Sequence, residues 1–174
     1  DNESFADVKT MDFTFTCRVG GMENDKGTIF LLHGFPETSR MWNDFIKVLE
    51  NEGYRIIAPD QRGYSKGARP SKVSDYTIDK LTQDIIDIAN EFNIDKFHLV
   101  GHDWGSAVGW YMVSKYSDRI ITWSALSVPH LDAFVYSMKN DKVQIKKSEY
   151  IKFFNKAILP EIYFKMFSYK NLKN

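Results

Sequence analysis

The sequence lacks most features that mark secreted or membrane proteins. Its one cysteine, Cys17, cannot form a disulfide within the chain. No apolar run approaches the roughly 20 residues that a helix needs to cross a bilayer. The first ten residues, DNESFADVKT, are acidic and polar where a secretion signal would be basic and then apolar. We therefore expect a cytoplasmic protein.

An excess of charge of either sign is also missing. The 23 Lys and Arg residues balance 23 Asp and Glu residues, so no overall field attracts nucleic acid or an anionic membrane. No phosphate-binding loop follows the first apolar runs, and no His or Cys cluster has the spacing of metal ligands. We expect no nucleic-acid or membrane partner, no metal and no cofactor.

The apolar pattern that is present predicts an α/β fold. The stretch FTFTCRV alternates like a half-buried strand, whereas TIFLLHG, YRIIAPD, KFHLVGH and ITWSALSV are nearly continuous apolar runs. Such runs are typical of strands covered on both faces. Helical patterns lie between them, at roughly 39–52, 77–92 and 104–116. This order predicts a mostly parallel sheet with crossover helices.

The pattern changes after Pro129. Two helix-like pieces follow, at about 131–138 and 148–167, separated by a lysine-rich polar link, KNDKVQIKK. No strand pattern comes after them, so the predicted strand 121–128 would leave an open apolar edge. We expect a core at residues 1–130 and an incomplete helical region at 131–174.

The motif GHDWG, residues 101–105, lies where a predicted strand meets a predicted helix. A G-x-nucleophile-x-G sequence at such a junction is typical of a nucleophile elbow, whose glycines permit a tight turn. The central residue is Asp103, and a carboxylate attacks saturated carbon to form an alkyl ester. Epoxides and alkyl halides are the natural electrophiles for this small-molecule chemistry. The simpler alternative is that Asp103 only caps the helix.

A second motif, HGFP, supplies what the ester's hydrolysis would need. That step places negative charge on the carbonyl oxygen of Asp103, which calls for backbone donors. The N–H of Trp104 at the helix start is one candidate, and the N–H of Phe35 is the other. Gly34 permits the inward turn of the loop, and Pro36 fixes its dihedral angle.

Several neighbouring residues have structural interpretations beside functional ones. Trp104, His33 and Pro36 are candidate substrate-binding residues, although Trp104 is equally well a core aromatic and His33 is better explained as hydrogen-bonding the loop. His98 and His102 are interpreted as satisfied core or loop histidines. The stretch DQRGYSKGARP, residues 60–70, is predicted to be a polar turn whose charges face solvent.

Through HGFPE, DQRGYS and GHDWG, the chain resembles the α/β-hydrolase family, and within it the epoxide hydrolases and haloalkane dehalogenases that use an aspartate nucleophile. The resemblance implies that Asp103 is the nucleophile, that the Phe35 and Trp104 amides form the oxyanion hole, and that residues 131–174 begin a helical cap. The segment SEYIKFFNKAILPE is similar to the cap segment that carries an acidic tyrosine. This match implies that Tyr150 donates to the epoxide oxygen and that Phe154 lines the pocket, although Tyr150 is also explained as an ordinary residue of an amphipathic helix.

The resemblance covers only part of the family's machinery. The family's second cap tyrosine, charge-relay acid and general-base histidine lie beyond the matched segment, so no residue here is assigned as the base. We interpret the chain as the amino-terminal portion of an epoxide-hydrolase-like protein, a fragment or a truncated product, for which complete turnover is not expected. The open edge would then accept a second copy or the missing carboxy-terminal part.

Three alternatives remain open. In a haloalkane dehalogenase, the Trp104 indole would hold the departing halide, but such enzymes commonly have Asn where this chain has Phe35. Fluoroacetate-type dehalogenases resemble the HGFP loop but generally carry Arg in the place of Trp104. The third alternative is a non-catalytic scaffold that has kept the motifs.

Overall fold

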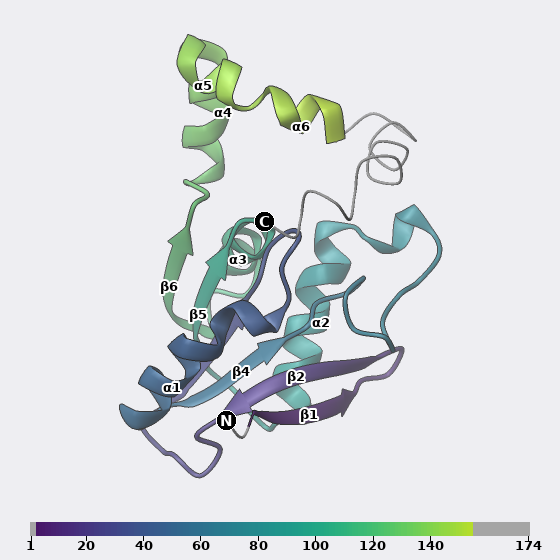
Figure 1. Cartoon of the computed structure of the whole chain (residues 1–174), viewed down its shortest axis with the longest axis vertical. Coiled ribbons are helices and arrows are strands. Elements are labelled where there is room, and N and C mark those ends of the chain that lie inside the picture. The colour runs from purple at the N-terminus through teal and green to yellow at the C-terminus, as the bar shows by residue number, and fades with distance from the viewer. Residues whose placement is uncertain (1–2, 155–174) are drawn as a thin grey trace, which may run out of the picture. The chain divides into compact units, whose positions relative to one another are not determined.

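A computed structural model describes residues 3–154, the last three by their backbone alone. The chain divides into two units, Asp1–Pro129 and His130–Asn174, and each is described by itself. The first unit is an α/β structure built on a six-stranded sheet of order β1-β2-β4-β3-β5-β6 (Figure 1). Its strands are β1 (Ser4–Lys9), β2 (Thr14–Gly20), β3 (Thr28–Leu32), β4 (Arg55–Pro59), β5 (Phe97–His102) and β6 (Ile120–Leu126).

The sheet is mixed but mostly parallel, as the sequence predicts. Strands β3, β4, β5 and β6 run parallel to one another, and β2 pairs antiparallel with both β1 and β4. The helical segments that connect them are η1 (Ser39–Trp42), α1 (Asn43–Asn51), η2 (Val73–Asp75), α2 (Ile78–Glu91) and α3 (Trp104–Lys115). Each crossover connection returns the chain to the end of the sheet where the parallel strands begin. The carboxyl ends of the neighbouring strands β3 and β5 therefore lie together at the opposite end.

Two apolar layers explain why the central strands are continuously hydrophobic. Phe30 and Leu32 of β3 belong to a core cluster with α2 and α3, whereas Ile29 and Leu31 belong to a second cluster with Trp42 and Ile46. Successive side chains of a strand point to opposite faces, so a strand buried on both faces needs apolar residues at every position. Figure 1 shows α1 on one face of the sheet and α2 and α3 on the other.

Helix ends follow local rules. After α1, Gly53 has φ +89 and donates to the Glu50 carbonyl at 3.0 Å, while the Tyr54 N–H donates to the Leu49 carbonyl at 3.1 Å. This pair of bonds is a Schellman motif, in which a residue with positive φ ends the helix. Asn93 ends α2 in the same way, with φ 56.

Two elements differ from the sequence prediction. The first strand, Ser4–Lys9, was not predicted, because it is an edge strand whose positions are mostly exposed and whose apolar residues follow no regular alternation. In the second unit, α4 (Leu131–Asn140) is followed by α5 (Lys142–Lys147) and α6 (Glu149–Phe154). The predicted polar link between the two helix-like pieces therefore contains a helix of its own, capped by Asp141, whose side chain accepts from the N–H groups of Val143 and Gln144.

Strand β6 pairs with β5 on one side, and no described strand pairs with its other side. Ile121 and Leu126 are exposed on it. Within the described ranges, none of the helices combines the length and apolar character that crossing a membrane requires.

Candidate active site

Asp103 lies in a one-residue turn between β5 and α3. Its φ is 52, in the region that L residues rarely adopt, and its N–H donates to the Leu126 carbonyl of β6 at 3.3 Å. Its own carbonyl accepts the N–H groups of Ser106 and Ala107, which starts α3. A positive φ at a non-glycine residue costs energy and persists where the surroundings impose it, as they do at many functional sites.

Glycines permit this turn, because a side chain at either of their positions would overlap neighbouring backbone. A Cβ atom on Gly105 would lie 2.2 Å from the Leu32 carbonyl oxygen, and one on Gly101 would lie 2.5 Å from the Gly105 carbonyl oxygen. No real side chain is accommodated at such distances. Helix α3 therefore starts in backbone contact with the end of β3, and this contact brings the two motifs together.

Ser106, which the sequence reasoning did not single out, also holds the turn. Its buried hydroxyl lies 2.5 Å from the Gly101 carbonyl and accepts the N–H of Leu126 at 3.2 Å. These bonds join the ends of β5 and β6 to the first turn of α3. A serine in an apolar helix gives no signal in sequence that its partners lie on two strands.

The side chain of Asp103 does not cap its helix. It makes no capping hydrogen bond, and Oδ1 instead accepts the N–H of Phe35 at 2.9 Å, from the loop after β3. The capping interpretation of Asp103 is therefore wrong, because the positive φ directs the carboxylate away from the helix amides. The loop comes so close that a Cβ atom on Gly34 would lie 2.4 Å from the Asp103 Cβ.

His33 holds this loop through hydrogen bonds of its buried side chain. Its side chain is fully buried, Nδ1 lies 2.9 Å from the Gly34 carbonyl, and Nε2 lies 3.0 Å from the Gln61 backbone nitrogen. Because an N–H group only donates, Nε2 is the acceptor and Nδ1 carries the proton. Burial lowers the pKa of His33, opposed by its bond to Gly34 and by the charges of Asp60 and Glu37, so the ring is held neutral.

The other predicted residues of this loop and turn are open to solvent. Trp104 is 62% exposed, so it is not a core aromatic, and its N–H at the first position of α3 has no acceptor within the helix. Phe35 and Pro36 are exposed and joined by a cis peptide bond. His33 does not fit its predicted contact with substrate, because no part of its side chain is exposed.

A family model described as the alpha/beta hydrolase fold matches residues 27–172. This chain belongs to the α/β-hydrolase family. It is 38% identical over 154 residues to the AB hydrolase superfamily protein YfhM of Bacillus subtilis, covering 88% of this chain and 54% of that protein. It is 32% identical to mouse epoxide hydrolase 4, covering 90% of this chain and 43% of that one.

Solved structures agree with these relatives. An epoxide hydrolase mutant of Vigna radiata matches with a TM-score of 0.70 and 32% identity, over 74% of this chain and 40% of that chain. Epoxide hydrolase A of Mycobacterium thermoresistibile matches with a TM-score of 0.68 and 32% identity, over 74% of this chain and 40% of that chain. The hydrolase-fold chain thus spans about half or less of the proteins it matches.

The third motif of this hydrolase-fold chain, DQRGYS, is not the solvent-facing turn that the sequence suggests. Arg62 is 8% exposed, and its Nε and Nη2 donate to the two carboxylate oxygens of Asp84 at 2.8 and 2.6 Å. Desolvation raises the pKa of Asp84, which the bonds from Arg62 oppose. The prediction is wrong for Arg62, because Asp84 lies 22 residues away, on α2, where sequence offers no sign of the pairing. Lys66 and Arg69 of the same stretch are exposed, as predicted.

Tyr150 and Phe154 belong to the second unit. Tyr150 lies in α6 and is 58% exposed. The side chain of Phe154 lies outside the described residues. The predicted roles of both residues at the hydrolase site stay predictions.

The other three histidines are His98, His102 and His130, and in the described part of the chain none of them hydrogen-bonds to the Asp103 carboxylate. His98 Nδ1 lies 2.8 Å from the Thr122 hydroxyl of the neighbouring strand. His130 precedes α4, and its Nδ1 accepts the N–H of Asp132 at 3.3 Å. His102 is partly buried beside Asp103, and its Nδ1 has no hydrogen-bond partner among the described residues, so the prediction that it is satisfied does not hold for that atom.

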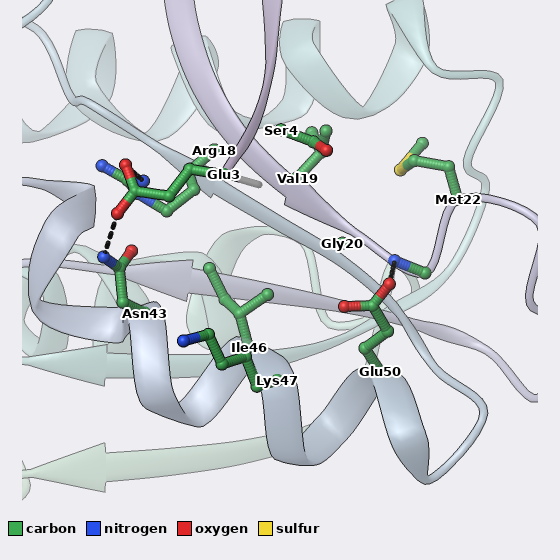
Figure 2. A pocket seen from close by; sticks show the side chains of 11 residues that line it. Glu3, Ser4, Arg18, Val19, Gly20, Met22, Asn43, Ile46, Lys47 and Glu50 are labelled. Atoms are coloured by element: carbon green, nitrogen blue, oxygen red, sulfur yellow. Dashed lines mark hydrogen bonds and ion pairs between the residues drawn. The ribbon is translucent and has the colours of Figure 1, made fainter. Parts of the chain in front are cut away.

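A hollow of about 130 Å³ lies between the end of β2 and α1, away from these motifs. Figure 2 shows Arg18 beside Glu3 and Asn43 at one end and Glu50 at the other. The Gly21 N–H donates to Glu50 Oε1 at 3.1 Å. Arg18 pairs with Glu3 at 2.7 Å and lies over the Phe5 ring. None of the predicted site residues lines this hollow.

Proposed function

We propose that this chain carries the nucleophilic half of an epoxide hydrolase site, with Asp103 as the nucleophile. The observation that carries the proposal is the hydrogen bond from the Phe35 N–H to Asp103 Oδ1, at 2.9 Å. A backbone amide of the HGFP loop thereby holds one carboxylate oxygen at a turn of positive φ. The names of the relatives, most of them epoxide hydrolases, favour the same chemistry.

The mechanism begins with attack on the epoxide. The carboxylate oxygen that Phe35 does not hold forms a bond to a ring carbon, and the carbon–oxygen bond of the ring breaks with its electron pair on oxygen. The resulting alkoxide takes a proton from an acid, the role we propose for Tyr150. Oδ1 becomes the carbonyl oxygen of the ester and stays in place.

Hydrolysis then uses the same donors. Water adds to the carbonyl carbon of Asp103 and gives up a proton, and the negative charge collects on Oδ1. The N–H groups of Phe35 and Trp104 stabilise this oxyanion, and their contribution grows as the charge develops. The intermediate then collapses by breaking the bond between the carbonyl carbon and the alkyl oxygen. That oxygen takes the remaining proton of the added water and leaves as part of a diol, and the carboxylate is restored. We assign the base that activates water to no residue of the chain.

The test is the intact mass of the purified chain after exposure to styrene oxide or to butyl bromide. We expect styrene oxide to add its mass once, on a peptide that contains Asp103, and Asp103→Asn to abolish the increment. Asp118→Asn, which removes an exposed surface carboxylate, is the matched control and should leave the increment unchanged.

Each outcome decides between the candidate functions. An adduct from butyl bromide alone would overturn the epoxide proposal in favour of a haloalkane dehalogenase, for which the exposed Trp104 indole is a suitable halide donor. No adduct from a folded sample would identify this chain as a scaffold. Equal labelling of the Asp103→Asn variant would remove Asp103 from the mechanism.

A further inference from the structure

The oxyanion donor at Phe35 lies on a loop whose own bonds determine where its N–H points. Strand β3 ends at Leu32, and Phe35 follows three residues later without regular secondary structure. An exposed loop of this kind holds an amide in one direction only if other groups fix its backbone. The groups that do so here are buried side chains.

His33 provides the first restraint. Its Nδ1–H donates to the carbonyl of Gly34, and that carbonyl belongs to the same peptide unit as the Phe35 N–H. Because a peptide unit is planar, fixing the carbonyl at one end fixes the direction of the N–H at the other. The ring of Tyr64 packs edge-on against the His33 ring, with 4.6 Å between ring centroids, and prevents it from turning away.

Gln61 provides the second restraint, from the loop after β4. Its backbone N–H donates to His33 Nε2 at 3.0 Å, and its side-chain amide donates to the His33 carbonyl at 2.5 Å. Gln61 thus binds both the ring and the backbone of one residue, and it is only 9% exposed. These bonds form a continuous path from Gln61 through His33 to the peptide unit that donates to Asp103.

We propose that His33 and Gln61 are positioning residues that hold the Phe35 N–H against Oδ1 of Asp103 and so set the strength of the oxyanion hole. The proposal rests on the function proposed above and concerns the second chemical step. Neither side chain touches the reacting atoms. Their effect passes through the peptide unit between Gly34 and Phe35.

The two chemical steps should respond differently to a loosened loop. A hydrogen bond to a carboxylate makes it less nucleophilic, so weakening it leaves alkylation of Asp103 unchanged or slightly faster. Attack on the ester carbonyl creates the charge that the bond stabilises, so the same weakening slows ester cleavage. General unfolding would slow both steps, which distinguishes a positioning role from a merely structural one.

The variants divide the contacts of His33 between them. His33→Asn keeps a donor near the Nδ1 position and loses the acceptor for Gln61, whereas His33→Gln keeps an acceptor near the Nε2 position and loses the donor to Gly34. Gln61→Met removes the side-chain bond to the His33 carbonyl without adding charge. His98→Asn is the matched control, because His98 bonds to Thr122 on β6 and not to the loop.

The experiment loads Asp103 with styrene oxide and then adds hydroxylamine, which cleaves the ester at the carbonyl carbon and leaves a hydroxamate. We expect His33→Gln and Gln61→Met to slow cleavage about tenfold, less than the roughly 100-fold or greater effect of losing an oxyanion donor. His33→Asn should be closer to the unsubstituted chain, because it retains the bond to Gly34. His98→Asn should cleave at the unsubstituted rate, and alkylation rates should not fall.

An NMR measurement tests the inference even if the chain takes no adduct. The Phe35 amide proton resonance should move when Asp103→Asn removes the charge it faces, and His33→Gln should make it insensitive to that substitution. Unchanged cleavage together with an unchanged Phe35 resonance would overturn the positioning role. If the chain is not alkylated but the Phe35 resonance moves on Asp103→Asn and no longer does so in the His33→Gln background, the proposed function would be rejected and the positioning role kept.

Discussion

The loop after β4 and the turn after β5 both place polar residues behind an apolar strand, but they use these residues in opposite ways. In the loop, Arg62 is buried and donates to both carboxylate oxygens of Asp84, which is also buried. In the turn, the carboxylate of Asp103 accepts one hydrogen bond among the described residues.

The comparison teaches how to separate polar residues that build a fold from polar residues that react. Groups of the first kind are buried and have most of their hydrogen bonds made within the protein, because an unpaired buried charge is costly. The carboxylate of Asp103 is oriented by one donor, the Phe35 N–H, and its other oxygen keeps lone pairs with which it can react. Motif identity alone does not make this distinction, since DQRGYS and GHDWG look equally polar in sequence.

The largest expected effect comes from removing one partner of the buried Arg62–Asp84 pair. Arg62→Met leaves the Asp84 carboxylate buried without its partner, and we expect it to lower the free energy of unfolding by roughly 3–5 kcal/mol. Urea denaturation followed by circular dichroism measures the change. Arg62→Met combined with Asp84→Leu should recover most of the loss, and a single-variant loss below about 1 kcal/mol would show that the pair is unimportant.

A smaller effect is expected from His33, whose ring accepts a hydrogen bond from Gln61 in the loop after β4. The folded-state pKa of His33 lies below the ordinary value of about 6.5 because burial penalises the charged ring. The unfolded chain therefore binds the proton first, so the stability that the neutral ring contributes is complete above about pH 6.5 and is lost as pH falls below it. Protonation would also remove the acceptor for the Gln61 N–H.

Urea midpoints measured at several pH values between 8 and 5 check this sign, with His33→Asn as the reference that lacks the titrating ring. The unsubstituted chain should lose more stability than the variant over the acid half of that range. Carboxylates titrate in both proteins, so parallel curves would show that His33 does not contribute.

The smallest effect is expected at the reactive residue itself. Asp103→Asn keeps the size of the side chain and an oxygen that accepts the Phe35 N–H, and the side chain makes no helix-capping bond to lose. We expect the free energy of unfolding to change by less than about 0.5 kcal/mol, by the same urea titration. A loss comparable with that of Arg62→Met would place Asp103 among the structural residues and erase the contrast.

Much of the fold was predictable because the local pattern of apolar residues matches the burial that each strand and helix has in the folded chain. The central strands are continuously apolar since both faces are covered, and the helix pattern predicted at 104–116 is found at Trp104–Lys115. The strand Ser4–Lys9 was missed because only Val8 of it is buried, so it carries little apolar signal. The short helix Lys142–Lys147 was missed because its lysines resemble a linker.

The candidate site was predictable in outline, and its supports were not. GHDWG and HGFP each carry a sequence signature, and the structure brings Asp103 and Phe35 into hydrogen-bond contact. Ser106 and Gln61 carry none, because their roles depend on partners 20 and 28 residues away in the chain. Residues that support a site through long-range contacts are visible only once the strands are in register.

The near-contact between Gly34 and Asp103 also constrains how this protein can vary. Any side chain at position 34 would need the space that the Cβ of Asp103 occupies, 2.4 Å from where its own Cβ would lie. A side chain at position 34 is therefore tolerated only if residue 103 loses its Cβ, whereas a replacement at 103 that keeps the Cβ, such as Asp103→Asn, requires no change at Gly34. In descendants of this chain, the chemistry of residue 103 can therefore change while the glycine of the loop stays fixed.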